Sequence, residues 1–399
     1  MNAAMQQVFE PKSALHVSDA CTSCDNCRSV CQSGAIQGEP GKKHWIDLTR
    51  CVSCGQCMIN CQSGAISDVS MIPQIQRALA DPRKVVVVKG TPFIKAALGE
   101  YFEVKEESVP GKFCTALREL GFDKVFESEF NTDLTIMEEG TELIHRLYKG
   151  FGVSGFDDAG PLPQITSWCT AWTKYAENKY PELLQNLSSA KSPQQMFGKL
   201  AKSYSANKMN VNPANMYVVA VMSCVAKKYE GHRSDERANL YEDVDAALTT
   251  RELIQMIEDA HIDFSALPET KADQFMASYP AGENLFGAYG GILEATLKVT
   301  YELLSGEQLE QINFSAVPDL PGVMEAHLEI PLKQLGKIMP VNVCTISELK
   351  CTDEIIKSVL AGKNKYHFID VITCKGGCVN GGGQPFLIHK DEKNLRNSN

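Results

Sequence analysis

The cysteines are the residues in this sequence whose number and spacing could do chemistry. The chain of 399 residues has 15 of them, and eight fall in two runs, CTSCDNCRSVCQSGAI at 21–36 and CVSCGQCMINCQSGAI at 51–66. The two runs are one unit written twice, 30 residues apart, and each has the spacing C-x2-C-x2-C-x3-C. This spacing is typical of chains that bind two 4Fe–4S clusters.

The spacing also predicts which thiols share a cluster, because the fourth cysteine of each run reaches the cluster of the other run. The first ligand set would be Cys21, Cys24, Cys27 and Cys61, and the second would be Cys51, Cys54, Cys57 and Cys31. We expect each fourth cysteine to open a short helix. Paired C-x2-C units also form zinc sites, but two complete four-cysteine runs favour clusters. Two clusters in series indicate electron transfer to or from a site in residues 85–399.

A further group of cysteines is scattered through the rest of the chain. Cys169 stands alone in TSWCTAW (166–172), between two of the three tryptophans. Three more thiols lie at or just beyond the ends of predicted strands, where open α/β sheets bind ligands; these are Cys224, Cys374 and Cys378. Four thiols are what one cubane requires, but buried structural cysteines explain them equally well. The three that we interpret as structural are Cys114, Cys344 and Cys351.

Alternating strands and helices must position these thiols. Residues 84–90 (KVVVVKG) read as a buried strand followed by a helix, and residues 132–149 have helical apolar spacing. The glycine-rich stretch 150–160 is loop. Further strands are predicted at 216–224, at the start of 245–260 before a helix, and at 367–374. This alternation indicates an α/β domain with a largely parallel sheet.

Composition excludes several classes of function. The formal net charge of −10 argues against a nucleic-acid footprint, which would need a basic stripe. No apolar run approaches the roughly 18 residues that span a bilayer, and residues 1–13 carry no export signal. We therefore expect a cytoplasmic protein with no membrane or nucleic-acid partner. Fifteen cysteines in that setting favour metal or redox chemistry over disulfides.

Three loops together resemble a known family. CKGGCVNGGGQP (374–385), TSWCTAW (166–172) and MSCVAKKYE (222–230) are similar to the three signature loops of the iron-only (FeFe) hydrogenases. The resemblance runs from the ferredoxin-like cysteine runs to about residue 385. It implies an α+β ferredoxin-like N-terminal domain at 1–80. An α/β catalytic domain at 81–399 would follow, with the cofactor between two lobes.

The resemblance implies an active-site cofactor, the H-cluster. This is a 4Fe–4S cubane bridged by a cysteine to a diiron unit that carries carbon monoxide, cyanide and azadithiolate. By position, Cys169, Cys224 and Cys374 would hold the cubane and Cys378 would be the bridge. The family's cyanide-binding lysine matches Lys227. Residues implied beside the diiron unit or orienting its neighbours are Met222, Gln194 and Glu230. We expect the glycines after Cys378 to let backbone approach the cofactor.

The resemblance also implies the activity, 2H⁺ + 2e⁻ ⇌ H₂, with electrons exchanged with ferredoxin or a similar carrier. Hydrogenase maturation proteins would build the cofactor. The family continues with a C-terminal helical segment beyond the glycine run, which either a separate small subunit supplies here or this branch lacks. The family's proton path matches Glu139, Ser188, Glu142 and Arg146, although a charged helix face is the plain alternative.

One departure concerns proton delivery. Trp168 stands where the family has a proton-relay cysteine, and an indole N–H donates a hydrogen bond but has no acceptor site. Thr170 and Thr373 also replace usual residues of these loops. We therefore predict a slow or directionally biased hydrogenase. A hydrogen or redox sensor and a non-catalytic iron–sulfur assembly relative are the alternatives. Asp157 and Asp158, in a lengthened loop, are a hypothetical replacement proton route.

Overall fold

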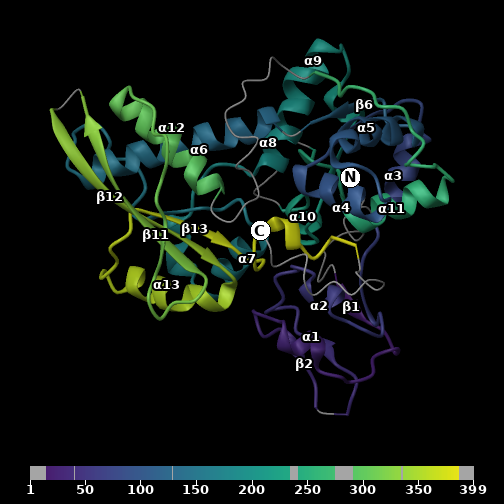
Figure 1. Ribbon diagram of the computed structural model, residues 1–399, viewed down its shortest axis with the longest axis horizontal. Coiled ribbons are helices and arrows are strands. Elements are labelled where there is room, and N and C mark those ends of the chain that lie inside the picture. The colour runs from purple at the N-terminus through teal and green to yellow at the C-terminus, as the bar shows by residue number, and fades with distance from the viewer. Residues whose placement is uncertain are drawn as a thin grey trace, which may run out of the picture.

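A computed structural model describes residues 15–39, 41–127, 129–233, 241–274, 291–333 and 336–385. The expectations for the first 14 and the last 14 residues lie outside these ranges. Figure 1 shows a small N-terminal domain below two larger lobes, and β13, α7 and α10 lie near the centre where the three meet. No helix in the described ranges is long and apolar enough to cross a membrane.

The N-terminal domain repeats one structural unit, as its sequence does. Strand β1 (Leu15–Val17) pairs antiparallel with β4 (Ile66–Asp68), and β2 (Ile36–Gln37) pairs with β3 (Trp45–Ile46). Each cysteine run contains one short helix, α1 (Asn26–Ser29) or α2 (Gln56–Ile59). The fourth cysteine of each run follows this helix rather than opening it. The expected helix position was therefore wrong, because the third cysteine occupies it.

The first lobe is built on a four-stranded parallel sheet in the order β6-β5-β8-β9. Its strands are β5 (Val85–Lys89), β6 (Lys124–Phe126), β8 (Met216–Met222) and β9 (Ala246–Thr249). Because side chains alternate along a strand, Val86 and Val88 join one apolar core and Val87 the other. The first core is covered by α3 (Ile72–Leu79), α4 (Pro92–Tyr101), α5 (Val109–Glu119) and α11 (Thr250–Asp259). Helix α8 (Pro193–Leu200) covers the second.

The second lobe has a mixed five-stranded sheet in the order β10-β11-β12-β13-β7. Its strands are β10 (Ser315–Ala316), β11 (Val323–Leu332), β12 (Lys337–Ser347), β13 (Phe368–Ile372) and β7 (Gln164–Ile165). The β10–β11 and β11–β12 pairs are antiparallel, and β12, β13 and β7 run parallel. Helices α6 (Glu129–Gly150) and α12 (Gly291–Ser305) pack on one face, and α7 (Thr170–Lys179) and α13 (Thr352–Leu360) on the other. The prediction of a parallel sheet is thus confirmed for the first lobe and incomplete for the second.

The glycines of the third signature loop lie where the N-terminal domain meets the two lobes. A Cβ on Gly382 would overlap the Cys54 carbonyl of the N-terminal domain, and one on Gly381 would overlap the Ser223 carbonyl of the second signature loop. Across the same junction Gln56 donates from Nε2 to the Asn380 carbonyl at 2.8 Å. These glycines therefore allow backbone to meet backbone, a role that the sequence did not indicate.

Gly382→Ala should loosen this junction. Overpacking of this kind costs about 1–3 kcal/mol, so the apparent Tm should fall by several degrees, as differential scanning fluorimetry under anaerobic conditions would measure. Gly362→Asn is the control, because Gly362 has φ 65° and open space around a Cβ and asparagine tolerates this left-handed conformation. Equal Tm values for both variants would contradict the role of Gly382.

Candidate metal centre

The structure brings together the thiols that were predicted to share clusters in the N-terminal domain. The pKa of the Cys27 thiol is raised first by burial and then by the charges of Cys61, Cys21 and Cys24. Burial likewise raises the pKa of Cys57, and the thiols acting on it most strongly are Cys54, Cys51 and Cys31. Each group of neighbours is one of the two predicted ligand sets. A buried histidine that sequence reasoning missed, His44, lies with Nδ1 3.6 Å from Cys27 Sγ.

A third group of thiols forms where strands of the two lobes end. Cys169 caps the start of α7 after β7, Cys224 follows β8, and Cys374 and Cys378 follow β13. Burial raises the pKa of Cys374 well above its ordinary value, and Cys224, Cys378 and Cys169 act on it next. Four thiols from three distant segments therefore face one another. They are not isolated structural cysteines.

The thiols of each group match the ligands of an iron–sulfur cluster in type and number. A zinc ion needs four ligands within about 2.3 Å of one point. In the described part of the chain, no three His, Cys, Asp or Glu side chains are grouped closely enough to hold one metal ion. A cubane spreads its ligands farther apart, around eight atoms. Each four-thiol group thus supplies the number and type of donors that a 4Fe–4S cluster takes.

The second N-terminal thiol group adjoins the third group. Burial raises the pKa of Cys54 to about 12, and the thiol of Cys224, which follows β8 of the first lobe, is among those that raise this pKa further. Gln56 bridges the two groups, because its Nε2 donates to Cys374 Sγ at 3.6 Å as well as to the Asn380 carbonyl. Electrons leaving one group would therefore reach the other without crossing a layer of solvent.

A buried ion pair lies beside the third thiol group. Lys227 Nζ donates to Glu230 Oε1 at 2.6 Å and to the Trp168 carbonyl at 2.9 Å. Its positive charge counteracts the rise in the pKa of Cys224 and Cys378, which places the amine near those sulfurs. Glu230 is held in turn by the Thr170 hydroxyl at 2.6 Å and the Ser192 hydroxyl at 2.8 Å. The short helix α10 (Ala226–Glu230) carries both charged groups.

Gln194 and Met222 lie in the same buried region. Gln194 Nε2 donates to the Lys227 carbonyl at 3.1 Å and to Glu230 Oε2 at 3.3 Å. Its Oε1 is buried and has no hydrogen-bond partner among the described residues. A buried amide oxygen without a partner fits a site that a polar group fills. The residues present therefore fit the H-cluster in thiol number, in nearby positive charge and in this orphaned oxygen.

The structure also joins the four residues of the expected proton path. Ser188 Oγ donates to Glu142 Oε2 at 2.8 Å, and Arg146 Nη2 donates to Glu142 Oε1 at 2.6 Å. Glu139 is buried one turn earlier on α6, and burial, then Asp370 and Glu142, raise its pKa to about 8. By contrast, Asp157 and Asp158 are exposed in the loop after α6. No contact that we observe ties these two aspartates to the path.

Trp168 lies beside the third thiol group and contacts Asp370, whose charge acts on Glu139. Its side chain is buried beside those of Ile292 and Ile372, and Cys169 and Cys378 pack against these three apolar side chains. Its indole Nε1 donates to Asp370 Oδ1 at 3.3 Å. Sequence reasoning missed Asp370, a fully buried carboxylate whose pKa burial raises to about 6. The single acid within the apolar run of HFIDVITC was the only signal, since a lone acid inside an apolar strand needs a partner.

A buried lysine in the first lobe was also missed. Lys89 ends β5 with no exposed surface, and its Nζ donates only weakly, at 3.4 Å, to the Pro193 carbonyl. Burial, and then the charge of Lys227, lower its pKa from 10.5 to about 7. The sequence carried a signal, because a lysine that directly follows four valines of a buried strand is expected to lie away from solvent.

Comparisons with known proteins agree with this geometry. Residues 84–382 match the family described as "Iron only hydrogenase large subunit, C-terminal domain", and residues 20–66 match "4Fe-4S dicluster domain". The chain belongs to the iron-only hydrogenase family. It is 42% identical over 370 residues to the periplasmic Fe hydrogenase large subunit of Nitratidesulfovibrio vulgaris, covering 92% of this chain and 85% of that one.

Other members of the iron-only hydrogenase family extend the comparison. Iron hydrogenase 1 of Clostridium pasteurianum is 42% identical over 327 residues, which is 82% of this chain but 54% of that protein. The chain thus spans about half the length of that relative. A solved FeFe hydrogenase of Chlamydomonas reinhardtii superposes with a TM-score of 0.72 at 31% identity, covering 82% of this chain and 87% of that one. Proteins named cytosolic Fe–S cluster assembly factors also match, at 29% identity for the one from Danio rerio.

Lys89→Met should stabilise the protein in a pH-dependent way. Because the folded pKa is lowered, the unfolded chain binds more protons between about pH 7 and 10.5, so the lysine destabilises the fold most at or below pH 7. The variant should raise the apparent Tm by several degrees at pH 7, and this gain should shrink as the pH rises to 9. A gain that is the same at both pH values would show that the buried amine is not the cause.

Proposed function

We propose that this chain is a catalytic FeFe hydrogenase that interconverts protons, electrons and H₂ at an H-cluster. The observation that supports it most is the placement of Cys378 and Lys227. Cys378, a fourth thiol beyond the three cubane positions, lies near the amine that the Glu230 carboxylate orients. An iron–sulfur protein that only stores or passes electrons needs no such pair.

The chain would hold two 4Fe–4S clusters on its N-terminal thiol sets. Cys169, Cys224 and Cys374 would hold the cubane of the H-cluster, and Cys378 would bridge it to the diiron unit. When bound, the diiron unit supplies the metal chemistry that couples two protons and two electrons to H₂. Lys227 Nζ would bind a cyanide group of that unit, with Gln194 and Met222 lining the same site.

Electrons would travel through the N-terminal domain. The thiol set that includes Cys54 adjoins the third group through Gln56, so its cluster would exchange electrons directly with the H-cluster cubane. The other set lies farther along the domain and would exchange electrons with ferredoxin or a similar external carrier. Maturation proteins would supply the diiron unit, and a separate small subunit is compatible with the fold.

A hydrogen sensor of the same family is the second candidate. The observation that favours it is Trp168, because its buried indole cannot pass on a proton from the Glu139 side. A sensor tolerates slow turnover, whereas an enzyme needs a working proton supply. The assembly-factor alternative is less consistent with the site, because the geometry brings Cys378 into the third thiol group.

Replacing Trp168 with cysteine should distinguish a slow enzyme from a sensor. A thiol at this position would connect Glu139 to the site, and general acid–base steps contribute about 10²–10⁴-fold. H₂ evolution by the matured, anaerobically purified protein should therefore rise at least about tenfold in Trp168→Cys. Trp168→Ala, which opens the same space without a thiol, should not match this gain. If both variants gain equally, space rather than proton relay limits turnover.

Iron content should report the ligand sets directly. Cys54→Ala should lose about four irons of the roughly twelve in three cubanes, with loss of the corresponding reduced-cluster signal in electron paramagnetic resonance. Cys351→Ala is the matched control, because Cys351 belongs to none of the three thiol groups. Retention of all iron in Cys54→Ala would remove Cys54 from the ligand set.

A further inference from the structure

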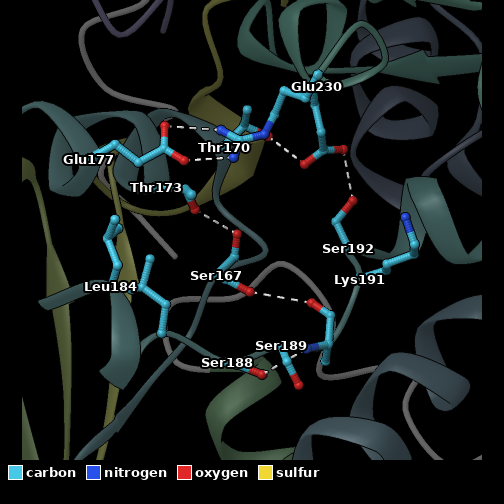
Figure 2. Close-up of a pocket in the computed structure, with 13 residues that line it drawn as sticks. Ser167, Thr170, Thr173, Glu177, Leu184, Ser188, Ser189, Lys191, Ser192 and Glu230 are labelled. Carbon is cyan, nitrogen blue, oxygen red and sulfur yellow. Dashed lines mark hydrogen bonds and ion pairs between the residues drawn. The ribbon is translucent and has the colours of Figure 1, made fainter. Parts of the chain in front are cut away.

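A polar pocket of about 380 Å³ leads from the surface to the Glu230–Lys227 pair. It opens beside the exposed residues Leu184 and Ser189 and extends inward to Glu230, which is 3% exposed. Six hydroxyl side chains line it, those of Ser167, Thr170, Thr173, Ser188, Ser189 and Ser192. Figure 2 shows these side chains arranged around the open space. The volume is many times the roughly 30 Å³ of one liquid water.

The inner wall of the pocket consists of groups that can accept and pass on a proton. Ser192 Oγ donates to Glu230 Oε2 at 2.8 Å, and Thr170 Oγ1 donates to Glu230 Oε1 at 2.6 Å. The same Oε1 accepts from Lys227 Nζ at 2.6 Å. Hydroxyl groups can donate and accept at the same atom. A continuous set of hydrogen bonds therefore runs from the pocket wall to the amine beside the third thiol group.

This connection avoids the side chain of Trp168. Lys227 Nζ contacts the Trp168 backbone carbonyl, whereas the indole turns to Asp370. The path that begins at Glu142 instead reaches Glu139, whose Oε2 is buried and has no hydrogen-bond partner among the described residues. The described contacts thus carry the Glu142 branch as far as Glu139, whereas the Ser192–Glu230 branch reaches Lys227.

We propose that this pocket, through Ser192, Glu230 and Lys227, is the proton entry of the chain. The proposal rests on the proposed hydrogenase function. Each transfer moves one proton and no electrons. A hydronium ion in the pocket protonates Glu230 at Oε2 through Ser192 Oγ and leaves as water. Lys227 Nζ gives a proton to the reaction site, and the protonated Glu230 carboxyl then turns and returns a proton to the neutral Lys227 amine. Two such cycles supply the two protons of H₂, and the reverse direction releases them.

The charged groups around the pocket favour water over a bound anion. Arg233 at its rim is paired with Glu177 at 2.6 Å, and Lys191 with Asp243 at 3.3 Å. At the inner end the charge of Lys227 faces that of Glu230, and both charges act on the pKa of the nearby Lys89. The positive charges lining the pocket are therefore balanced by carboxylates, and the remaining lining combines hydroxyl groups with apolar side chains.

The test is to plug the pocket without touching Glu230 or Lys227. Ser189→Phe puts a ring at the mouth, and H₂ evolution by the matured protein should fall at least about tenfold with an unchanged iron content and Tm. Glu182→Phe adds the same ring at an exposed position outside the pocket and should leave the rate unchanged. Ser192→Ala removes the hydroxyl at Glu230 Oε2 and should slow turnover with a larger solvent deuterium isotope effect.

A second readout needs no diiron unit. A high-resolution crystal structure of the protein carrying only its iron–sulfur clusters should show ordered waters from Ser189 to Ser192 Oγ, and Ser189→Phe should lack them. A dry pocket, or full turnover in Ser189→Phe and Ser192→Ala, would overturn the proposal. Absence of H₂ turnover in the unaltered protein, with waters present, would instead count against the proposed function.

Discussion

The structure depends on bringing together four thiols from three distant segments, of which Cys374 is buried and the others are half-buried. Thiols in an apolar setting have raised pKa values and repel one another once ionised, so the third group of cysteines is unfavourable without positive charge. Iron supplies most of that charge, and Lys227 supplies more. The two sheets, the junction glycines and the N-terminal domain all converge on this site. Metal binding and folding are therefore expected to be strongly coupled.

The sequence was most informative where chemistry fixes the spacing. The C-x2-C-x2-C-x3-C runs and the strand-end positions of Cys224 and Cys374 predicted which thiols meet, because ligand geometry allows few alternatives. The α/β architecture and the family also followed from local patterns. The β11–β12 hairpin was not predicted, although VMEAHLEIPL alternates apolar and polar residues with the period of two that is typical of a strand.

Other features could not be predicted, because they depend on contacts between distant segments. Nothing local shows that Gly382 meets the Cys54 backbone or that Asp370 accepts from the Trp168 indole. Lys89 and Asp370 each carry a local signal, a lone charge in or at the end of an apolar strand, but their partners depend on segments far away in the sequence. The pocket that ends at Glu230 is lined by three separate segments of the chain, so no single sequence motif predicts it.

The central claim is that the third thiol group, with Lys227, holds a diiron unit as well as a cubane. Infrared spectroscopy of the matured protein tests it most directly, because carbon monoxide and cyanide bound to iron absorb where proteins do not. The account predicts sharp bands from both ligands that shift when H₂ is admitted and that vanish in Cys378→Ala. A protein with all its cubanes assembled and no such bands would contradict it.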